Sequence, residues 1–311
     1  MTTNKNSAII KEKKDKMLEN ATLKHEDCIV FLKGLPDNSI DLVAADPPYC
    51  SVIKDKWDNQ WKNEEEYLDW CREWTEECFR VLKPGKCFYV WGTTKFDTFL
   101  RYKLDVLNKV SGANYQNWII WHYDWGGRTK KNFARKHEDL LMYSKGEEFD
   151  FYPDNILVER AVKSNMAITR KMNLIKKHFS EGLVTDKDWS SWETYRFDKK
   201  GFEELISEFE ALKKKDLKFK KGKIPTDVWM KNNHTTSKEY AGWHPTQKPL
   251  EIMDRIIKAN TQPGDVVLDC FAGSGSTMIS ALRTGRKFVG CEFDESYIEK
   301  TWERAKTLLD G

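Results

Sequence analysis

The sequence predicts an α/β protein built on a mostly parallel sheet with helices on both faces. Apolar runs typical of buried strands cover residues 40–45, 87–91, 265–270 and 287–292. Helix-like segments alternate with these runs, and such alternation favours a parallel sheet. Turns that carry polar residues or glycines follow two of the runs, at the strand ends where such sheets bind ligands.

The first half of the chain supplies two of these strands and a helix between them. After the strand at 40–45, a helix is predicted near residues 64–82, because apolar side chains recur there at helical spacing. The stripe consists of Tyr67, Trp70, Cys71, Trp74, Cys78 and Leu82. Pro84-Gly85 ends the helix, and 87–91 forms the next strand.

The tetrapeptide Asp46-Pro47-Pro48-Tyr49 directly follows the first strand. It suits chemistry on the exocyclic amine of adenine or cytosine, whose lone pair is delocalised into the ring. The Asp46 carboxylate and the Pro47 carbonyl can each accept one amino hydrogen, because the prolines lack amide donors and restrict the turn. Tyr49 offers a face for base stacking, worth roughly 1 to 3 kcal/mol. An ordinary Asp-Pro turn after a strand is the alternative.

A glycine turn, Phe271 to Thr277, links the strand at 265–270 to a helix at 278–283. Gly273 and Gly275 allow a ligand to approach the backbone, and the amides at the helix start favour negative groups. Glu292 ends the next strand, about 20 residues after Gly273. In nucleotide-binding folds, an acidic side chain at this spacing accepts hydrogen bonds from ribose hydroxyls. Met278 replaces the third glycine of a dinucleotide fingerprint, which argues against a dehydrogenase. The pattern predicts a nucleoside ligand.

Together the two motifs resemble those of the amino-group DNA methyltransferases that use S-adenosylmethionine. The resemblance is to the permuted beta class, in which the catalytic motif precedes the cofactor motif, and it covers roughly residues 22–149 and 226–308. Further matching segments are Val81-Leu82-Lys83-Pro84-Gly85, Trp118-Ile119-Ile120-Trp121, His137-Glu138, Asp227-Val228-Trp229 and His244-Pro245-Thr246-Gln247-Lys248-Pro249.

The resemblance implies a Rossmann-like methyltransferase sheet and an inserted, largely helical target-recognition region. The insert interrupts the strand pattern with many lysines and glutamates and a helix-like stretch at 201–215. In the family, this region reads base edges in the grooves. The expected divisions are a lysine-rich N-terminal extension (1–20), a catalytic half (21–149), the insert (150–226) and a cofactor-binding half (227–311).

The activity implied is site-specific methylation of the N6 amino group of an adenine flipped out of double-stranded DNA. The Asp-Pro-Pro-Tyr form is similar to that of adenine-N6 enzymes, whereas cytosine-N4 members more often carry Ser in place of the Asp. Three alternatives stay open: a cytosine-N4 enzyme on the same fold, an RNA or protein methyltransferase, and a DNA-recognition subunit that binds cofactor without turnover. The mechanism requires no metal.

The resemblance assigns catalysis to Asp46, Pro47, Pro48 and Tyr49. It implies that Asp27 accepts the adenine amino group of the cofactor, that Glu292 holds its ribose, and that Thr246 and Lys248 contact its carboxylate. A proline-bounded turn before a helix at 250–260 is the alternative for the last two. The complete expected cofactor set is Asp27, Cys28, Asp46, Thr246, Lys248, Asp269, Phe271, Gly273, Ser274, Gly275 and Glu292.

Basic side chains fall in two clusters, although the formal net charge is only +3. The first cluster is predicted to contact the DNA backbone and comprises Arg128, Lys130, Lys131, Arg135 and Lys136. The second comprises Lys213, Lys214, Lys215, Lys218, Lys220, Lys221 and Lys223, and suits a solvated face equally well. A homodimer and a cognate restriction endonuclease stay open as partners.

Composition predicts a cytoplasmic protein without a membrane partner. No apolar stretch approaches the ~20 residues of a membrane span, and residues 1–20 lack the hydrophobic segment of a secretion signal. The seven cysteines include no Cys-x-x-Cys pair, so the sequence indicates neither a disulfide framework nor a zinc site.

Overall fold

The computed structural model describes residues 15–50, 56–92, 103, 106–124, 131, 133–158, 223–231 and 237–309. The chain divides into two compact units, residues 1–156 with 226–311, and residues 157–225. Nearly all of the second unit lies outside the described residues, and so does the helix-like stretch at 201–215 that the sequence predicts. The first unit contains both motifs.

The described part of the first unit contains an eight-stranded sheet in the order β1-β8-β7-β2-β3-β5-β4-β6. Neighbours are parallel except at the β3–β5 and β5–β4 pairs. The mostly parallel α/β sheet predicted from the sequence is therefore confirmed. The strands are β1 (Ala21–His25), β2 (Ile40–Ala45), β3 (Leu82–Gly92), β4 (Ala113–His122), β5 (His137–Lys145), β6 (Val228–Met230), β7 (Val266–Asp269) and β8 (Lys287–Glu292).

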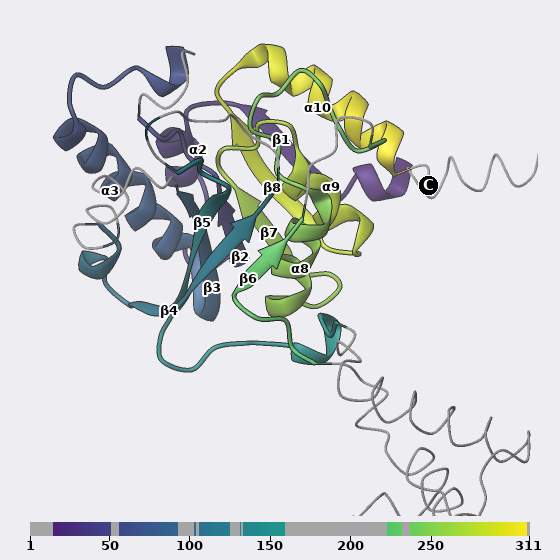
Figure 1. Cartoon of the computed structure of the whole chain (residues 1–311), viewed down its shortest axis with the longest axis horizontal. Helices are drawn as coiled ribbons and strands as arrows, with labels where there is room; N and C mark the ends of the chain where they lie inside the picture. The colour runs from purple at the N-terminus through teal and green to yellow at the C-terminus, as the bar shows by residue number, and fades with distance from the viewer. Residues whose placement is uncertain are drawn as a thin grey trace, which may run out of the picture. The chain divides into compact units, whose positions relative to one another are not determined.

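Helices cover both faces of this sheet (Figure 1). In the described part of the chain, the labelled α-helices are α2 (Cys28–Lys33), α3 (Glu64–Val81), α8 (Leu250–Asn260), α9 (Ser276–Arg283) and α10 (Glu295–Leu308). Short 3-10 segments lie at Lys56–Asp58, Leu107–Lys109 and Pro153–Asn155. None of the described helices combines the length and the apolar composition that a membrane span requires.

The central strands are apolar along their whole length because both of their faces are buried. In β2, Val43 and Ala45 pack in the core beneath α2 and α3. Leu42 and Ala44 point to the opposite core, which α8 and α9 cover. Side chains alternate between the faces of a strand, so a strand covered on both sides reads as one continuous apolar run.

Helix α3 begins where the Asn63 side chain accepts a hydrogen bond from the Glu66 amide at 2.9 Å. Three glutamates in the first turn add favourable charge at the positive end of the helix dipole. The predicted apolar stripe faces the core, with Trp74 and Cys78 fully buried. The helix ends at Val81, because the next residue is already extended and begins β3.

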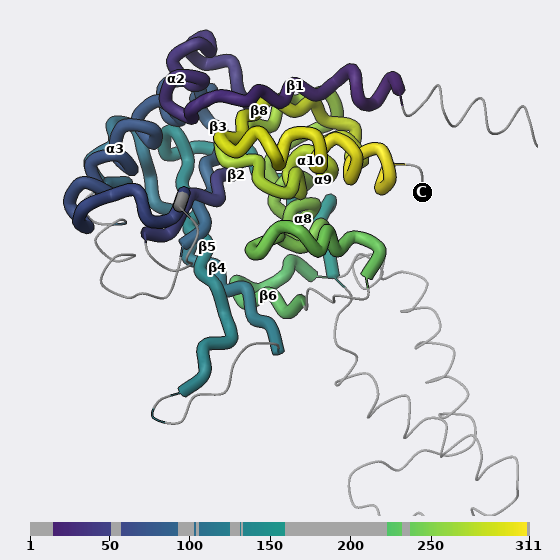
Figure 2. The backbone as a smooth tube through the Cα atoms, turned by 90° about the horizontal axis from the view of Figure 1, so that it is seen from above, coloured from purple at the N-terminus to yellow at the C-terminus, as the bar shows by residue number. Residues whose placement is uncertain are grey.

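The two ends of the described chain complete the sheet together. Strand β1 pairs in parallel with β8, and α10 lies beside β1 (Figure 2). The pairing places His25 against Glu292, and the Glu26 amide donates to the Glu292 carbonyl at 3.2 Å. The segment that follows β1 is thus held next to the end of β8.

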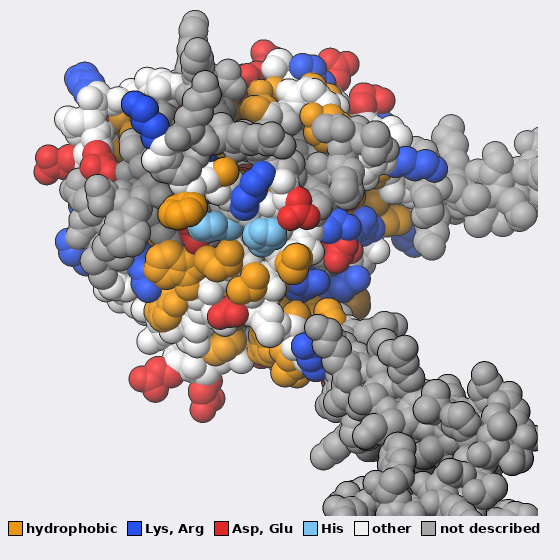
Figure 3. Space-filling view, in the orientation of Figure 1, with side chains coloured by type: hydrophobic (Ala, Val, Ile, Leu, Met, Phe, Trp, Pro, Cys, Tyr) orange, Lys and Arg blue, Asp and Glu red, His pale blue; other side chains and the backbone are white. Residues whose placement is uncertain are grey.

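The opposite edge of the sheet is the short strand β6. Its Val228 and Met230 side chains are 50% and 74% exposed, whereas Trp229 between them is buried. Figure 3 shows hydrophobic side chains gathered over β4 and β6 on this side of the molecule. The Arg255 guanidinium lies 5.0 Å from the Trp229 ring and fixes the strand to α8.

Candidate functional site

The two sequence motifs meet at the centre of the sheet. Strands β2 and β7 are parallel neighbours, with Val43 opposite Leu268, and the sheet grows outward from this pair through β3 on one side and β8 on the other. Ligands bind at the carboxyl ends of strands beside such a switch point. The tetrapeptide at 46–49 and the turn at 271–277 follow these ends and line one cavity. The prediction that they share a cleft is confirmed.

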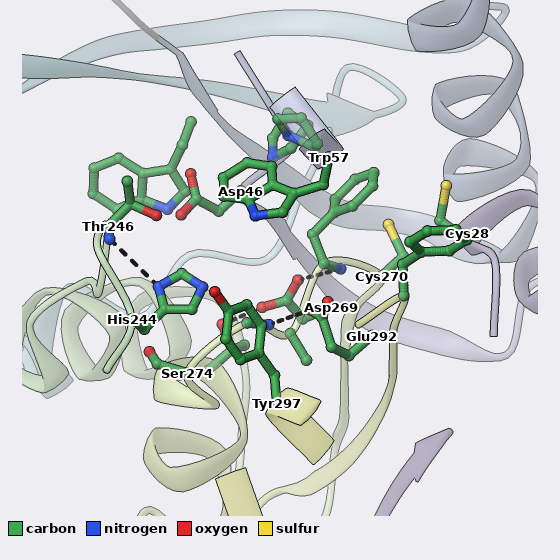
Figure 4. Close-up of a pocket in the computed structure, with 18 of the residues that line it drawn as sticks. Cys28, Asp46, Trp57, His244, Thr246, Asp269, Cys270, Ser274, Glu292 and Tyr297 are labelled. Atoms are coloured by element: carbon green, nitrogen blue, oxygen red, sulfur yellow. Dashed lines mark hydrogen bonds between the residues drawn. The ribbon is translucent and has the colours of Figure 1, made fainter. Parts of the chain in front are cut away.

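The cavity has a catalytic-motif side and a glycine-turn side. Figure 4 shows Asp46, Trp57 and Thr246 on one side, opposite Asp269, Glu292 and Tyr297. Of the expected cofactor set, only Gly275 does not line this cavity. Several other residues line the cavity without having been predicted from the sequence, namely Trp57, Trp70, Trp91, His244, Phe293 and Tyr297.

Hydrogen bonds hold the tetrapeptide in position. The Tyr49 hydroxyl donates to Asp46 Oδ1 at 2.5 Å, and the Tyr49 amide donates to Asp58 Oδ1 at 2.6 Å. The Tyr67 hydroxyl on α3 donates to the Pro48 carbonyl at 2.9 Å. Among the described residues, none donates to the Pro47 carbonyl. Within the described part of the chain, this carbonyl thus keeps its capacity to accept a hydrogen bond.

A buried lysine joins Asp46 to a second carboxylate, Glu138, for which the sequence predicts no role. Lys248 Nζ lies 2.6 Å from Asp46 Oδ2 and 3.2 Å from Glu138 Oε2, and its side chain is 5% exposed. Burial alone would lower the pKa of Lys248, but Asp46 and Glu138 together raise that pKa above its ordinary value. Burial raises the pKa of Glu138, and the Lys248 ammonium opposes this shift.

On the other side of the cavity, two carboxylates shape the glycine turn. Glu292 accepts hydrogen bonds from the amides of Gly273, at 2.7 Å, and Asp294, at 2.9 Å. Asp269 accepts from the Phe271 amide at 3.0 Å and from the Thr277 hydroxyl at 2.6 Å. Burial raises the pKa of Asp269 to about 7. Asp269 and Glu292, two of the residues that the sequence assigns to the cofactor, thus order the backbone of the glycine turn.

Asp27 caps helix α2, since its Oδ1 accepts the amides of Ile29 and Val30 at 2.9 and 3.1 Å. Its place between β1 and α2 brings it into the cavity beside the end of β8. His244 packs against Tyr297, with ring centroids 5.0 Å apart. Burial lowers the pKa of His244 to about 4, so its imidazole is neutral at physiological pH.

The glycines of the turn are required for two different reasons. At Gly273 (φ 47°), an added Cβ would lie 2.7 Å from His244 Nε2, at the wall of the cavity. At Gly275 (φ 77°), an added Cβ would overlap with Thr301 Cγ2 on α10. Gly275 therefore serves the packing of α9 against α10, which explains why it does not line the cavity.

Gly275→Ala is expected to lower the free energy of unfolding by about 2 kcal/mol or more, from left-handed strain and overpacking. Adding Thr301→Ser removes the clashing methyl but keeps the hydroxyl that donates to the Gly273 carbonyl at 2.8 Å. The double variant should recover the stability that Gly275→Ala loses through overpacking, but should still lose about 1 kcal/mol through backbone strain. Urea denaturation of the wild type, the two single variants and the double variant measures the coupling between the two positions. Strictly additive changes in the free energy of unfolding would refute the contact.

The structure describes only part of the first basic cluster. Lys131 and Arg135 are exposed, and Lys136 Nζ donates to the Asp124 carbonyl at 2.8 Å. Arg128 and Lys130 lie outside the described residues, as does the second lysine cluster except Lys223. Contact of these side chains with DNA stays a prediction.

A mostly parallel sheet with these motifs at its switch point defines a Rossmann-like methyltransferase fold. The solved PvuII DNA methyltransferase, described as cytosine-N4-specific, superposes with a TM-score of 0.59 at 16% identity, covering 94% of this chain and 93% of that one. The M1.HpyAVI complex with S-adenosylmethionine superposes with a TM-score of 0.51 at 17% identity, covering 91% and 99%.

The chain belongs to the DNA methylase family, whose N6_N4_Mtase model matches residues 40–303. The DNA adenine methyltransferase YhdJ of Escherichia coli K12 is 32% identical over 286 residues, which cover 90% of this chain and 81% of YhdJ. The type II methyltransferase M.BglII of Bacillus subtilis is 33% identical over 282 residues, covering 89% of this chain and 66% of M.BglII. Assignment to the permuted beta class stays a prediction.

Proposed function

We propose that this DNA methyltransferase transfers a methyl group from S-adenosylmethionine to the N6 amino group of an adenine flipped out of double-stranded DNA. The observation that carries the proposal is that Asp46 and Pro47 line the same cavity as the turn around Gly273. A base inside a duplex cannot reach such a cavity, so the adenine must leave the stack.

The glycine-turn side fits the cofactor. Glu292 and Asp27 are carboxylates at the edge where β8 and β1 end, and each keeps lone pairs beyond those that its backbone partners use. Glu292 would accept from the ribose hydroxyls and Asp27 from the adenine amino group, while Phe271 lines the cavity with an apolar surface. When bound, S-adenosylmethionine supplies an electrophilic methyl group on a sulfonium.

The tetrapeptide prepares the amine of the target base. Asp46 and the Pro47 carbonyl each accept one amino hydrogen, which draws the nitrogen lone pair out of the ring. Tyr49 supplies its ring as a stacking surface. Transfer of the methyl group to the amine would leave the carbon–sulfur electron pair on sulfur and would place positive charge on the amine nitrogen. The Asp46 carboxylate stabilises this charge, and the spare amine proton leaves to Asp46 or to water afterwards.

Adenine is favoured over cytosine because the motif carries Asp46 rather than serine, and because YhdJ is named as an adenine enzyme. Cytosine-N4 methylation is the second candidate, since the structural neighbour PvuII methyltransferase is named for that activity.

The choice of base can be tested directly. Unmethylated DNA is incubated with the protein and S-adenosylmethionine, digested to nucleosides and analysed by mass spectrometry, with the Asp46→Ala variant as the control. We expect N6-methyladenine from the wild type only. N4-methylcytosine would overturn the assignment of the base, and equal product from both proteins would overturn the role of Asp46.

We also propose that Lys131, Arg135 and Lys136 contact DNA phosphates and that the insert reads the recognition site. Contacts to phosphates position a protein on DNA, whereas contacts to base edges give specificity. A homodimer and a restriction endonuclease remain candidate partners in this proposal.

A further inference from the structure

Both oxygens of the Asp46 carboxylate are engaged. Oδ1 accepts from the Tyr49 hydroxyl at 2.5 Å, and Oδ2 receives the Lys248 ammonium at 2.6 Å. An ammonium this close weakens the ability of the Asp46 carboxylate to stabilise a growing positive charge on a substrate amine. If Lys248 and Asp46 formed an isolated pair, their charges would cancel.

Glu138 prevents this isolation. Its Oε2 lies 3.2 Å from Lys248 Nζ, so one cation is shared between two carboxylates. The Glu138 side chain is 17% exposed and does not line the cavity, so it acts from behind Lys248.

The fold explains how a residue so distant in sequence reaches this site. Strand β5 is antiparallel to β3, with Leu140 opposite Trp91, so β5 begins at the edge where β2 and β3 end. Glu138 is the second residue of β5 and is therefore carried to the same edge as Asp46. Among the described residues, the other charged and titratable groups that interact with Glu138 are Asp46, Arg135, Tyr49 and Tyr123.

We propose that Glu138 is a positioning residue that shares the charge of Lys248 and so leaves Asp46 negative toward the target amine. This inference rests on the function proposed above. With both carboxylates ionised and Lys248 protonated, the trio carries one net negative charge. Replacing Glu138 by a neutral side chain removes that charge, although Asp46, the acceptor itself, is unchanged.

The test is the isosteric variant Glu138→Gln in the full-length protein. We expect the rate of methyl transfer at saturating DNA and cofactor to fall about tenfold or more, because stabilising charge is lost at the reacting amine. The Kd of S-adenosylmethionine should stay unchanged, because Glu138 does not line the cavity and Lys248 keeps Asp46 as an ionic partner at 2.6 Å. Glu147→Gln, an exposed glutamate just after β5, is the matched control and should behave as wild type.

The dependence on pH separates an effect of charge from an effect of packing. Below its pKa, Glu138 is protonated and neutral, as glutamine is at every pH. The ratio of wild-type to Glu138→Gln rates should therefore be largest at alkaline pH and should shrink toward one as the pH falls through that pKa. Titrations of groups that do not interact with Glu138 cancel in this ratio. A ratio that does not change with pH would overturn the proposal.

Two further variants make the outcome decisive. Glu138→Asp keeps the charge and should retain more activity than Glu138→Gln; equal or lower activity would count against the proposal, even if the glutamine variant folds poorly. Asp46→Asn distinguishes a failure of the proposed function from a failure of the role of Glu138 alone. If Asp46→Asn turns over normally, the proposed function fails. If it is inactive while Glu138→Gln matches wild type, only the role of Glu138 fails.

Discussion

Asp46→Asn is expected to lower the rate of methyl transfer about a hundredfold to a thousandfold while leaving cofactor binding intact. The amide has the shape of the carboxylate, but one of its two acceptors becomes a donor and its negative charge is lost. The target amine then loses the group that stabilises its growing positive charge. Single-turnover transfer of a labelled methyl group measures the rate, and calorimetry measures the affinity for S-adenosylmethionine.

The variant should still fold, because Lys248 keeps Glu138 as an ionic partner and is not left as a buried unpaired charge. Asp254→Asn is the matched control, since Asp254 pairs with Arg283 at 2.6 Å outside the cavity. Wild-type turnover of Asp46→Asn would contradict the catalytic assignment. Loss of cofactor binding would instead make Asp46 mainly a cofactor ligand.

The sequence predicts the central strands well, and the reason is physical. Strands β2 and β7 are buried on both faces, so the requirement for apolar side chains applies to nearly every position and is visible without a partner. Parallel neighbours also place their carboxyl ends at one edge. This is why Asp46 and Gly273, far apart in sequence, could be predicted to share a cleft.

Elements away from the centre of the sheet are harder to predict from the sequence. Strand β1 has five residues with alternating partial exposure, and α2 has six residues, too few for a helical period to show. The capping role of Asp27 depends on the start of that short helix. The pairing of Glu138 with Lys248 depends on β5 running antiparallel to β3, and no local pattern of residues encodes that direction.

Glu292→Gln is expected to raise the Kd of S-adenosylmethionine about 10- to 100-fold, the equivalent of one lost hydrogen bond to a charged group. Glu292 holds the amides of Gly273 and Asp294, and a glutamine must turn its amino group toward one of these donors or toward the ribose. Calorimetric titration measures the change. Glu299→Gln, an exposed position on α10, is the matched control.

An analogue of the cofactor that lacks a ribose hydroxyl distinguishes direct contact from a distorted turn. If Glu292 accepts from that hydroxyl, the wild type should bind the analogue more weakly than S-adenosylmethionine, and Glu292→Gln should bind the two almost equally. If Glu292 only orders the turn at Gly273, removal of the hydroxyl should weaken binding by the same factor in both proteins. The effect of the substitution and the effect of the missing hydroxyl are then independent. An unchanged Kd for S-adenosylmethionine in Glu292→Gln would contradict both roles.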